Sequence, residues 1–389
     1  MFSKVLIANR GEIAGRIGKT LRRMGIASVA VYSDADRFTR PVLDADEAIR
    51  VGPAPAAESY LNVDAIIAAC LHSGAQAVHP GYGFLSENRS FAEKLAEHDI
   101  AFIGPRPEHL DAFGLKHKAR EIARLSRVPL LPGSGLLETV EEALAEAEIV
   151  GYPLMLKSTA GGGGIGMQLC YDADALRERF ATVQRTARAS FGDARVYLER
   201  FVAEARHIEV QIFGNGKGNV VALGERDCSL QRRNQKVIEE TPAPGLSEEM
   251  RARLHEAAVA LGRSVAYESA GTVEFIYDVE REDFYFLEVN TRLQVEHPVT
   301  EAVFGIDLVE WMVRQAAGED VLAGLGPLVP KGAAIEVRVY AENPNAGFRP
   351  SAGRLTCVRF PDDARVDGWI ETGVEVTPFY DPMLAKVIV

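Results

Sequence analysis

Short apolar runs alternate with longer amphipathic segments from the N-terminus to residue 103. The apolar runs cover residues 5–8, 28–32, 77–79 and 101–103. In the segments between them, apolar side chains recur with helical spacing. Strands that alternate with helices in this way favour a parallel, doubly wound sheet. The Gly/Pro-broken loop at 79–88 follows an apolar run, where such sheets form sites, and a structural turn explains it equally well.

The next part of the chain combines a helix pattern with strong breakers. Helical spacing covers residues 116–125, and a cluster of prolines and glycines at 129–135 then has the composition of a hinge. Thr139 and Glu142 have the spacing of a capping box, so we expect a helix over residues 140–150.

A glycine-rich loop follows an apolar strand pattern at 154–157. Five glycines occupy the six positions 161–166. They leave backbone amides uncovered, so a polyphosphate can approach closely, with Lys157 supplying compensating charge. The residue order differs from that of a P-loop, and a loop that is only flexible is the alternative. The charged motifs that follow favour phosphate binding.

Strict alternation over residues 206–212 predicts a strand with one apolar and one polar face. Ile208 and Val210 lie on the first face, and His207, Glu209 and Gln211 lie on the second. Taken alone, this pattern favours a polar face that is exposed to solvent.

A basic segment then appears in a chain that is acidic overall. Residues 226–236 contain four cations, among them Lys236, and Glu239 and Glu240 follow directly. A solvated loop is one interpretation. An anion site in a cleft of mixed charge is the interpretation that we favour.

The most informative segment is residues 284–297, an aromatic strand that ends in charged and amide side chains. Period-2 alternation predicts that Phe284, Phe286, Glu288 and Asn290 share one face. Carboxylate and amide oxygens are hard ligands of the kind that Mg²⁺ accepts. A solvated strand end is the weaker alternative, because polar groups rarely recur on so aromatic a strand.

A second carboxylate stands on the preceding strand pattern. Glu274 lies within residues 271–277, and pairing through the acidic turn 278–283 would allow Glu274 and Glu288 to share a metal. Arg292 and Glu296 follow at the strand end, so metal, anion and base groups occur close together. We therefore expect a catalytic segment.

Composition limits the class of protein. A chain of 389 residues suggests more than one domain, and 47% hydrophobic with 25% charged residues is typical of a globular protein. A net charge of −12 argues against a general nucleic-acid surface. The sequence has no pattern of a signal peptide or membrane span. Four widely spaced cysteines predict a cytoplasmic location.

Together the motifs resemble the biotin carboxylase members of the ATP-grasp superfamily over essentially the whole chain. The motifs that carry the resemblance are residues 8–14, 79–83, 225–229, 292–301 and 380–382, with Lys116, Lys157, the glycine loop, Glu199, Glu274 and Glu288-x-Asn290. The resemblance implies an α/β protein whose central domain has the α+β ATP-grasp fold. It also implies a Rossmann-like domain over 1–112, an ATP-grasp domain over 113–325 with a mobile lid at about 130–200, and a truncated C-terminal domain over 326–389.

The resemblance also implies a role for each candidate residue. ATP would be held by Lys116, Lys157, Gly161, Gly162, Gly163, Gly164, Gly166, Glu199, His207, Gln231 and Asn234. Glu274, Glu288 and Asn290 would bind Mg²⁺ or Mn²⁺. Bicarbonate would be held by Arg292, Gln294, Val295 and Lys236, with Glu296 as its base. Arg338 would stabilise the ionised ureido group of biotin.

Arg338 lies in another alternating segment, residues 334–340. Ile335, Val337 and Val339 share one face, so Glu336, Arg338 and Tyr340 share the other. An exposed salt bridge is the alternative to a role at the biotin.

Two departures from the common pattern point to a branch of the family. Ile165 and Asn234 stand where many acyl-CoA-type biotin carboxylases have arginine and histidine, and the chain looks like urea carboxylase here. A guanidine or acyl-CoA carboxylase, another ATP-grasp ligase and a non-catalytic ATP-binding regulatory module are the alternatives.

The resemblance also predicts partners. The chain has no Met-Lys-Met sequence for biotin attachment, so biotin is expected on a biotin carboxyl carrier domain. A carboxyltransferase domain, in the same longer chain or on a separate subunit, and a homodimer are expected as well. On this view the chain is part of a larger multidomain enzyme.

Overall fold

The structure of the protein is a computed structural model that describes residues 1–158 and 166–389. The predicted Gly161, Gly162, Gly163 and Gly164 therefore lie outside the described residues.

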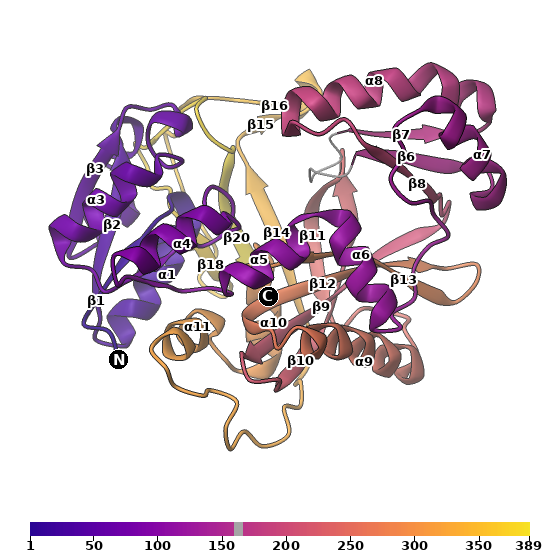
Figure 1. Ribbon diagram of the computed structural model, residues 1–389. Helices are drawn as coiled ribbons and strands as arrows, with labels where there is room; N and C mark the ends of the chain where they lie inside the picture. Colours follow the sequence, from indigo (N-terminus) through magenta and orange to yellow (C-terminus); the bar gives the residue numbers. More distant parts are fainter. Residues whose placement is uncertain (159–165) are drawn as a thin grey trace.

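The N-terminal part, drawn in indigo and purple in Figure 1, contains a parallel sheet with helices around it. The sheet has five strands in the order β3-β2-β1-β4-β5, as expected for a doubly wound fold. Its elements are β1 (Lys4–Ile7), α1 (Gly11–Arg23), β2 (Ala27–Ser33), α2 (Arg40–Leu43), β3 (Glu47–Gly52), α3 (Val63–Ser73), β4 (Ala77–His79), α4 (Arg89–Glu97), β5 (Ala101–Phe102) and α5 (Pro107–Gly114). Strand β3 was not predicted, because it is an edge strand whose first residues are largely exposed and carry a weak apolar pattern.

A smaller three-stranded sheet projects beyond the centre of the molecule, with helices packed against it (Figure 1). It contains β6 (Leu154–Ser158), β7 (Met167–Cys170) and β8 (Val196–Arg200), and α7 (Val140–Val150) and α8 (Ala173–Phe191) pack on it. The predicted capping box of Thr139 and Glu142 is present at the start of α7. Helix α6 (Lys116–Leu125) precedes this unit and has the predicted bounds.

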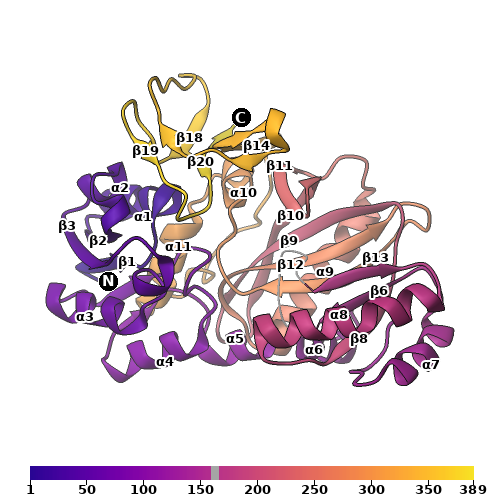
Figure 2. The same ribbon diagram turned by 90° about the horizontal axis from the view of Figure 1, so that it is seen from above.

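The central sheet has eight strands in the order β13-β12-β9-β10-β11-β14-β20-β18. Its first part is β9 (Ala205–Asn215), β10 (Val220–Arg232), β11 (Gln235–Thr241), β12 (Glu268–Asp278) and β13 (Asp283–Asn290), and α9 (Glu248–Ser264) packs on β9 and β10. Strands β14 (Ala334–Tyr340), β20 (Met383–Ile388) and β18 (Arg365–Gly368) extend the same sheet, so C-terminal residues stand directly beside the central strands (Figure 2). The mixed α/β fold is as predicted.

The remaining α-helices are α10 (His297–Phe304) and α11 (Leu308–Ala316). Two small two-stranded sheets complete the C-terminal part, one of β15 (Glu342–Asn343) and β16 (Arg349–Pro350), the other of β17 (Gly353–Arg354) and β19 (Glu375–Val376). One apolar cluster contains Ile13 and Ile17 of α1, Leu293 after β13 and Trp311 of α11. This cluster holds the segment after β13 against the N-terminal part of the chain, which fixes the position of the side chains that follow Leu293.

Candidate active site

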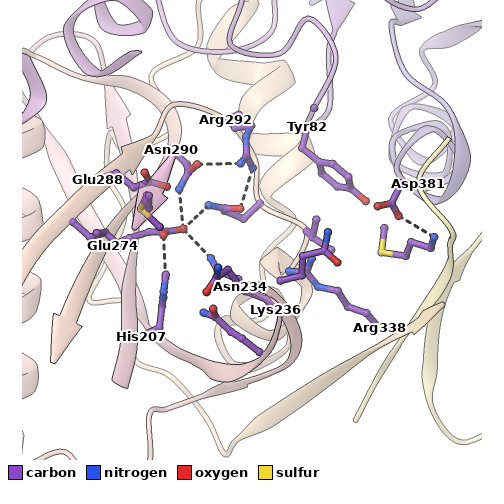
Figure 3. A pocket seen from close by; sticks show the side chains of 18 of the residues that line it. Tyr82, His207, Asn234, Lys236, Glu274, Glu288, Asn290, Arg292, Arg338 and Asp381 are labelled. Carbon is purple, nitrogen blue, oxygen red and sulfur yellow. Dashed lines mark hydrogen bonds and ion pairs between the residues drawn. The ribbon is translucent and has the colours of Figure 1, made fainter. Parts of the chain in front are cut away.

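A cavity of about 920 Å³ lies between the N-terminal sheet, the smaller three-stranded sheet and the central eight-stranded sheet. The predicted residues that line it are Lys116, Lys157, Glu199, His207, Gln231, Asn234, Lys236, Glu274, Glu288, Asn290, Arg292, Gln294, Val295 and Arg338. Figure 3 labels eight of them, His207, Asn234, Lys236, Glu274, Glu288, Asn290, Arg292 and Arg338. Glu296 is fully buried behind the wall, where it contacts two of the lining cations. Gly166 does not line the cavity, although its neighbour Met167 does.

The predicted hairpin of β12 and β13 is confirmed, and it places Glu274 directly opposite Glu288. The prediction that Phe286 and Glu288 share a face is wrong. The register shifts between Glu274 and Phe275, so Phe275 pairs with Phe286 and Leu287 is an extra residue in β13. This bulge turns Phe286 into the apolar core, while Leu287 and Glu288 both line the cavity.

The cation Lys236 lies at the centre of an acidic cluster. Its Nζ is 2.5 Å from Glu209, 2.8 Å from Glu274 and 2.7 Å from Glu296. Burial alone would lower the pKa of Lys236, but these three carboxylates outweigh it and hold the pKa well above its usual value. The basic segment is therefore part of a cleft of mixed charge, as predicted.

Glu296 is an ionised carboxylate in this cluster. Burial would raise its pKa, yet Lys236 and Arg338 hold the pKa of Glu296 well below its ordinary value of 4.5. Arg338 donates from Nη2 to the second Glu296 oxygen at 3.1 Å. The group is thus deprotonated, which is the form that can accept a proton, and both of its neighbouring cations also face the cavity.

The polar face of β9 is buried, so the expectation of a solvent-exposed face is wrong. Glu209 and Gln211 have no exposed surface because Arg226 of the neighbouring β10 lies against them. The Arg226 guanidinium donates to Glu209 at 2.6 Å, to Gln211 at 2.8 Å and to Thr300 of α10 at 2.9 Å. Glu209 was not predicted as a site residue, although it shares the polar face of residues 206–212 with the predicted His207, and the four cations at 226–236 were a further signal of an acidic partner.

At the other end of the cavity, the lysines expected to bind phosphates are paired with acids. Lys157 and Arg120 both contact the buried Glu199, one on each carboxylate oxygen. Lys116 lies 3.6 Å from Glu288. A polyphosphate that entered here would meet two lysines whose present partners are carboxylates.

Arg292 is held by groups from two parts of the chain. It donates to Asn290 at 3.0 Å and to Gln294 at 2.9 Å, and its Nε lies 3.1 Å from Glu87 of the loop after β4. Glu87 belongs to the Gly/Pro-broken loop whose role the sequence left open. Tyr82 of the same loop lines the cavity, so this loop forms part of its wall.

Strand β14 presents its charged face to the interior. Glu336 has no exposed surface, whereas Ile335 is 40% and Val337 is 38% exposed. Arg338 donates from Nε to Glu239 at 2.7 Å, and both of its carboxylate partners are fully buried. The alternative of an exposed salt bridge is therefore wrong.

Asn234 occupies a tight turn. Arg233 and Asn234 both have positive φ, 53° and 63°, between the end of β10 and the start of β11. Such turns require left-handed residues at both central positions, and asparagine adopts this conformation readily. The turn thus explains Asn234 without any ligand, while its position in the wall of the cavity still allows one.

Comparisons with known proteins agree with this geometry. The chain matches "Biotin carboxylase, N-terminal domain" over residues 1–110, "Carbamoyl-phosphate synthase L chain, ATP binding domain" over 116–323 and "Biotin carboxylase C-terminal domain" over 336–389. A solved biotin carboxylase domain of 2-oxoglutarate carboxylase from Hydrogenobacter thermophilus, in complex with MgADP, ADP and bicarbonate, is 43% identical with a TM-score of 0.95. The match covers 100% of this chain and 86% of that one.

The chain belongs to the biotin carboxylase family. The predicted enzyme class, an ATP-dependent ligase, is confirmed at the level of this family. Urea amidolyase of Lachancea kluyveri is 56% identical over 388 residues, which are 100% of this chain and 21% of that protein. The alpha chain of propionyl-CoA carboxylase from Ruegeria pomeroyi is 49% identical over 410 residues, covering 100% of this chain and 60% of that protein. The chain therefore spans only about a fifth of the first of these relatives.

The oxygen ligands in this biotin carboxylase suit a divalent cation. Glu274, Glu288 and Asn290 supply carboxylate and amide oxygens, which are the ligands that Mg²⁺ and Mn²⁺ accept. Ligand atoms of His207, Glu209 and Glu274 also lie within 4.8 Å of one another. The donor set therefore fits a metal that accompanies a nucleotide.

Among the residues that the structure describes, no helix has both the length and the apolar character needed to cross a membrane.

Proposed function

We propose that this chain carboxylates biotin at the expense of ATP and bicarbonate, through carboxyphosphate, as the first half-reaction of a biotin-dependent carboxylase. The observation that carries the proposal is the chain of contacts from Glu274 through Lys236 and Glu296 to Arg338, along one wall of the cavity. It joins a metal-binding carboxylate, an anion-binding cation, a base and a second cation in the order that the reaction needs them.

Bicarbonate is a stable anion and a poor electrophile, so ATP must activate it. In our proposal Lys236, Arg292 and Gln294, with the backbone at Val295, hold bicarbonate at the cavity wall. Glu296 accepts its proton while a bicarbonate oxygen attacks the γ-phosphorus. The bond from the γ-phosphorus to the bridging oxygen breaks, and ADP leaves with that electron pair.

The nucleotide end of the cavity neutralises the phosphates. Lys116 and Lys157 exchange their carboxylate partners for phosphate oxygens, and Glu199 borders the adenine. His207, Gln231 and Asn234 line the same cavity and complete the proposed nucleotide contacts. When bound, Mg²⁺ or Mn²⁺ on Glu274, Glu288 and Asn290 supplies positive charge at the phosphate oxygens.

Arg338 serves the second step. The carbon–oxygen bond of carboxyphosphate breaks, and the ureido nitrogen of biotin bonds to the carboxyl carbon and gives its proton to the departing phosphate. Negative charge develops on the ureido oxygen, and a fixed guanidinium stabilises it most where water is excluded. Arg338 lines the cavity with only 10% of its side chain exposed, and both of its carboxylate partners are fully buried, so its charge has few competing solvent contacts.

The final carboxyl acceptor belongs to the same proposal. We propose urea, which the high identity to a urea amidolyase supports. An acyl-CoA remains the alternative, because the propionyl-CoA carboxylase chain is also similar over the whole of this chain. Guanidine is a further candidate acceptor. Assaying ADP release by the full-length protein with each acceptor in turn separates the three.

We also propose the assembly that this activity needs. Biotin would arrive on a carrier domain, a carboxyltransferase domain would use the product, and two copies of this chain would form a homodimer. The domain division at residues 1–112, 113–325 and 326–389 and the lid at 130–200 belong to this proposal. Four free cysteines support a cytoplasmic location.

The test of the proposed function is ADP release by the full-length protein with and without bicarbonate and free biotin. We expect release that depends on bicarbonate and that free biotin stimulates. ATP cleavage that is indifferent to bicarbonate would refute the proposal.

A further inference from the structure

Arg338 is held from behind by a carboxylate that does not reach the cavity. Glu239 of β11 accepts a hydrogen bond from Nε of Arg338 at 2.7 Å, its ion-pair distance to Nη2 is also 2.7 Å, and it has no exposed surface. The remaining Nη2 contact of Arg338 goes to Glu296. Glu239 therefore fixes one edge of the guanidinium plane, while the arginine itself lines the cavity.

A second buried acid stands directly opposite Glu239. Glu336 of β14 is its cross-strand partner, which places the two Cβ atoms about 5 Å apart. Both Glu336 oxygens and one Glu239 oxygen have no hydrogen-bond partner among the described residues. Two adjacent buried carboxyl groups cannot both ionise without a large penalty, so at least one proton stays on this pair.

The charges around the pair decide where that proton resides. Burial raises the pKa of Glu336 well above its ordinary value, and the nearby Lys386, which lowers that pKa, does not offset it. For Glu239, burial outweighs Arg338 and raises the pKa to about 7. The other titratable groups that face the pair are Glu296, Lys236, Cys228, Tyr82 and Tyr340. From α10, His297 faces Lys386.

We propose that Glu239 is a positioning residue for the carboxylation of biotin: it orients the Arg338 guanidinium, and its protonation sets how much positive charge Arg338 presents to the ureido oxygen. This inference rests on the proposed function and adds to it. With Glu239 ionised, two carboxylates neutralise one guanidinium. With Glu239 protonated, only Glu296 does so, and the charge available for the developing oxyanion is larger.

Two substitutions of Glu239 separate the effect of its side-chain length from the effect of its charge. Glu239→Gln keeps the length and an acceptor oxygen but removes the charge, whereas Glu239→Asp keeps the charge and withdraws it by one methylene. Glu240→Gln is the matched control, because Glu240 is the next residue and no described contact joins its side chain to Arg338. The measurement is carboxylated biotin formed per phosphate released by the full-length protein, across about pH 6 to 8.5.

We expect Glu239→Asp to lower this ratio by about tenfold, the scale of losing one charge-assisted hydrogen bond, while bicarbonate-dependent ADP release stays within about twofold. The wild-type ratio should fall as the pH rises through about 7, because Glu239 then ionises. Glu239→Gln should keep a high ratio at every pH, and Glu240→Gln should follow the wild type.

A readout without biotin tests the proton directly. Infrared spectra of the protein alone should contain a protonated carboxyl band that titrates near neutral pH and is absent from Glu239→Gln. A wild-type ratio from Glu239→Asp would overturn the proposal. If that variant does not fold, equal pH profiles for the wild type and Glu239→Gln would overturn it instead. ATP cleavage by the wild type that ignores bicarbonate would refute the proposed function, a result distinct from either of these.

Discussion

Replacing Lys236 by methionine should damage both stability and catalysis, because one ammonium group serves three buried carboxylates. Its Nζ lies within 2.8 Å of Glu209, Glu274 and Glu296. Removing one partner of a buried ion pair costs about 3–5 kcal/mol. Each acid keeps one other cation, namely Arg226, His207 and Arg338 respectively. We therefore expect Lys236→Met to lower the free energy of unfolding by the lower end of this range, about 3 kcal/mol.

The loss of unfolding free energy in Lys236→Met should increase with pH. In Lys236→Met the pKa of Glu209, already raised by burial, rises further, and Glu296 loses the cation that contributes most to its low pKa. When the pKa of a buried carboxyl is above 4.5 in the folded state, the free energy of unfolding of the protein falls as the pH rises from 4.5 towards that folded-state pKa. The destabilisation should thus be largest at about pH 8 and smaller at about pH 5.

Urea unfolding of Lys236→Met at both pH values measures this penalty, with Lys217→Met as the control because Lys217 is exposed. Bicarbonate-dependent ADP release should fall by about 10²-fold or more, the scale of removing one preorganised electrostatic donor. A variant with wild-type stability at both pH values would refute the account of the acidic cluster. Full bicarbonate-dependent activity would refute the role of Lys236 in anion binding.

Three further substitutions separate the proposed roles. Glu288→Gln should weaken the Mg²⁺ dependence and ATP affinity, which nucleotide titrations at varied Mg²⁺ measure, because it removes a charged oxygen ligand. Glu296→Gln should leave nucleotide affinity nearly intact while kcat falls by about 10²-fold or more; the same binding defect in both variants would contradict this division. Arg338→Gln should retain bicarbonate-dependent ATP cleavage but release phosphate without carboxylated biotin, losing a few kcal/mol of transition-state stabilisation. Stoichiometric products from that variant would assign Arg338 a structural role.

Local patterns in the sequence predicted the elements that depend on local interactions. The capping box at Thr139 and Glu142 and helix α6 are present with the predicted bounds. The hairpin that pairs Glu274 with Glu288 is also present, because its acidic turn and two apolar strands are adjacent in sequence. The structure brings the candidate residues it describes to one cavity or its wall, apart from Gly166, while their individual roles stay predictions.

Features that depend on distant partners were not predictable in this way. The bulge at Leu287 arises from pairing with β12 and leaves no trace in the alternation of β13 alone. The buried polar face of β9 depends on Arg226 from the adjacent strand, and a single strand pattern cannot distinguish such a partner from water. The inward charged face of β14 has the same cause, since its neighbours Glu239 and Lys386 come from β11 and β20.

The central claim is that ATP cleavage in this cavity activates bicarbonate for transfer to biotin. The direct measurement is the full-length protein with ATP, Mg²⁺, free biotin and isotopically labelled bicarbonate, with ADP, phosphate and labelled biotin quantified in the same reaction. We predict that label enters biotin only when ATP is cleaved, and that cleavage ceases without bicarbonate. ADP formed at the same rate without bicarbonate, or biotin labelled without ATP, would contradict the claim.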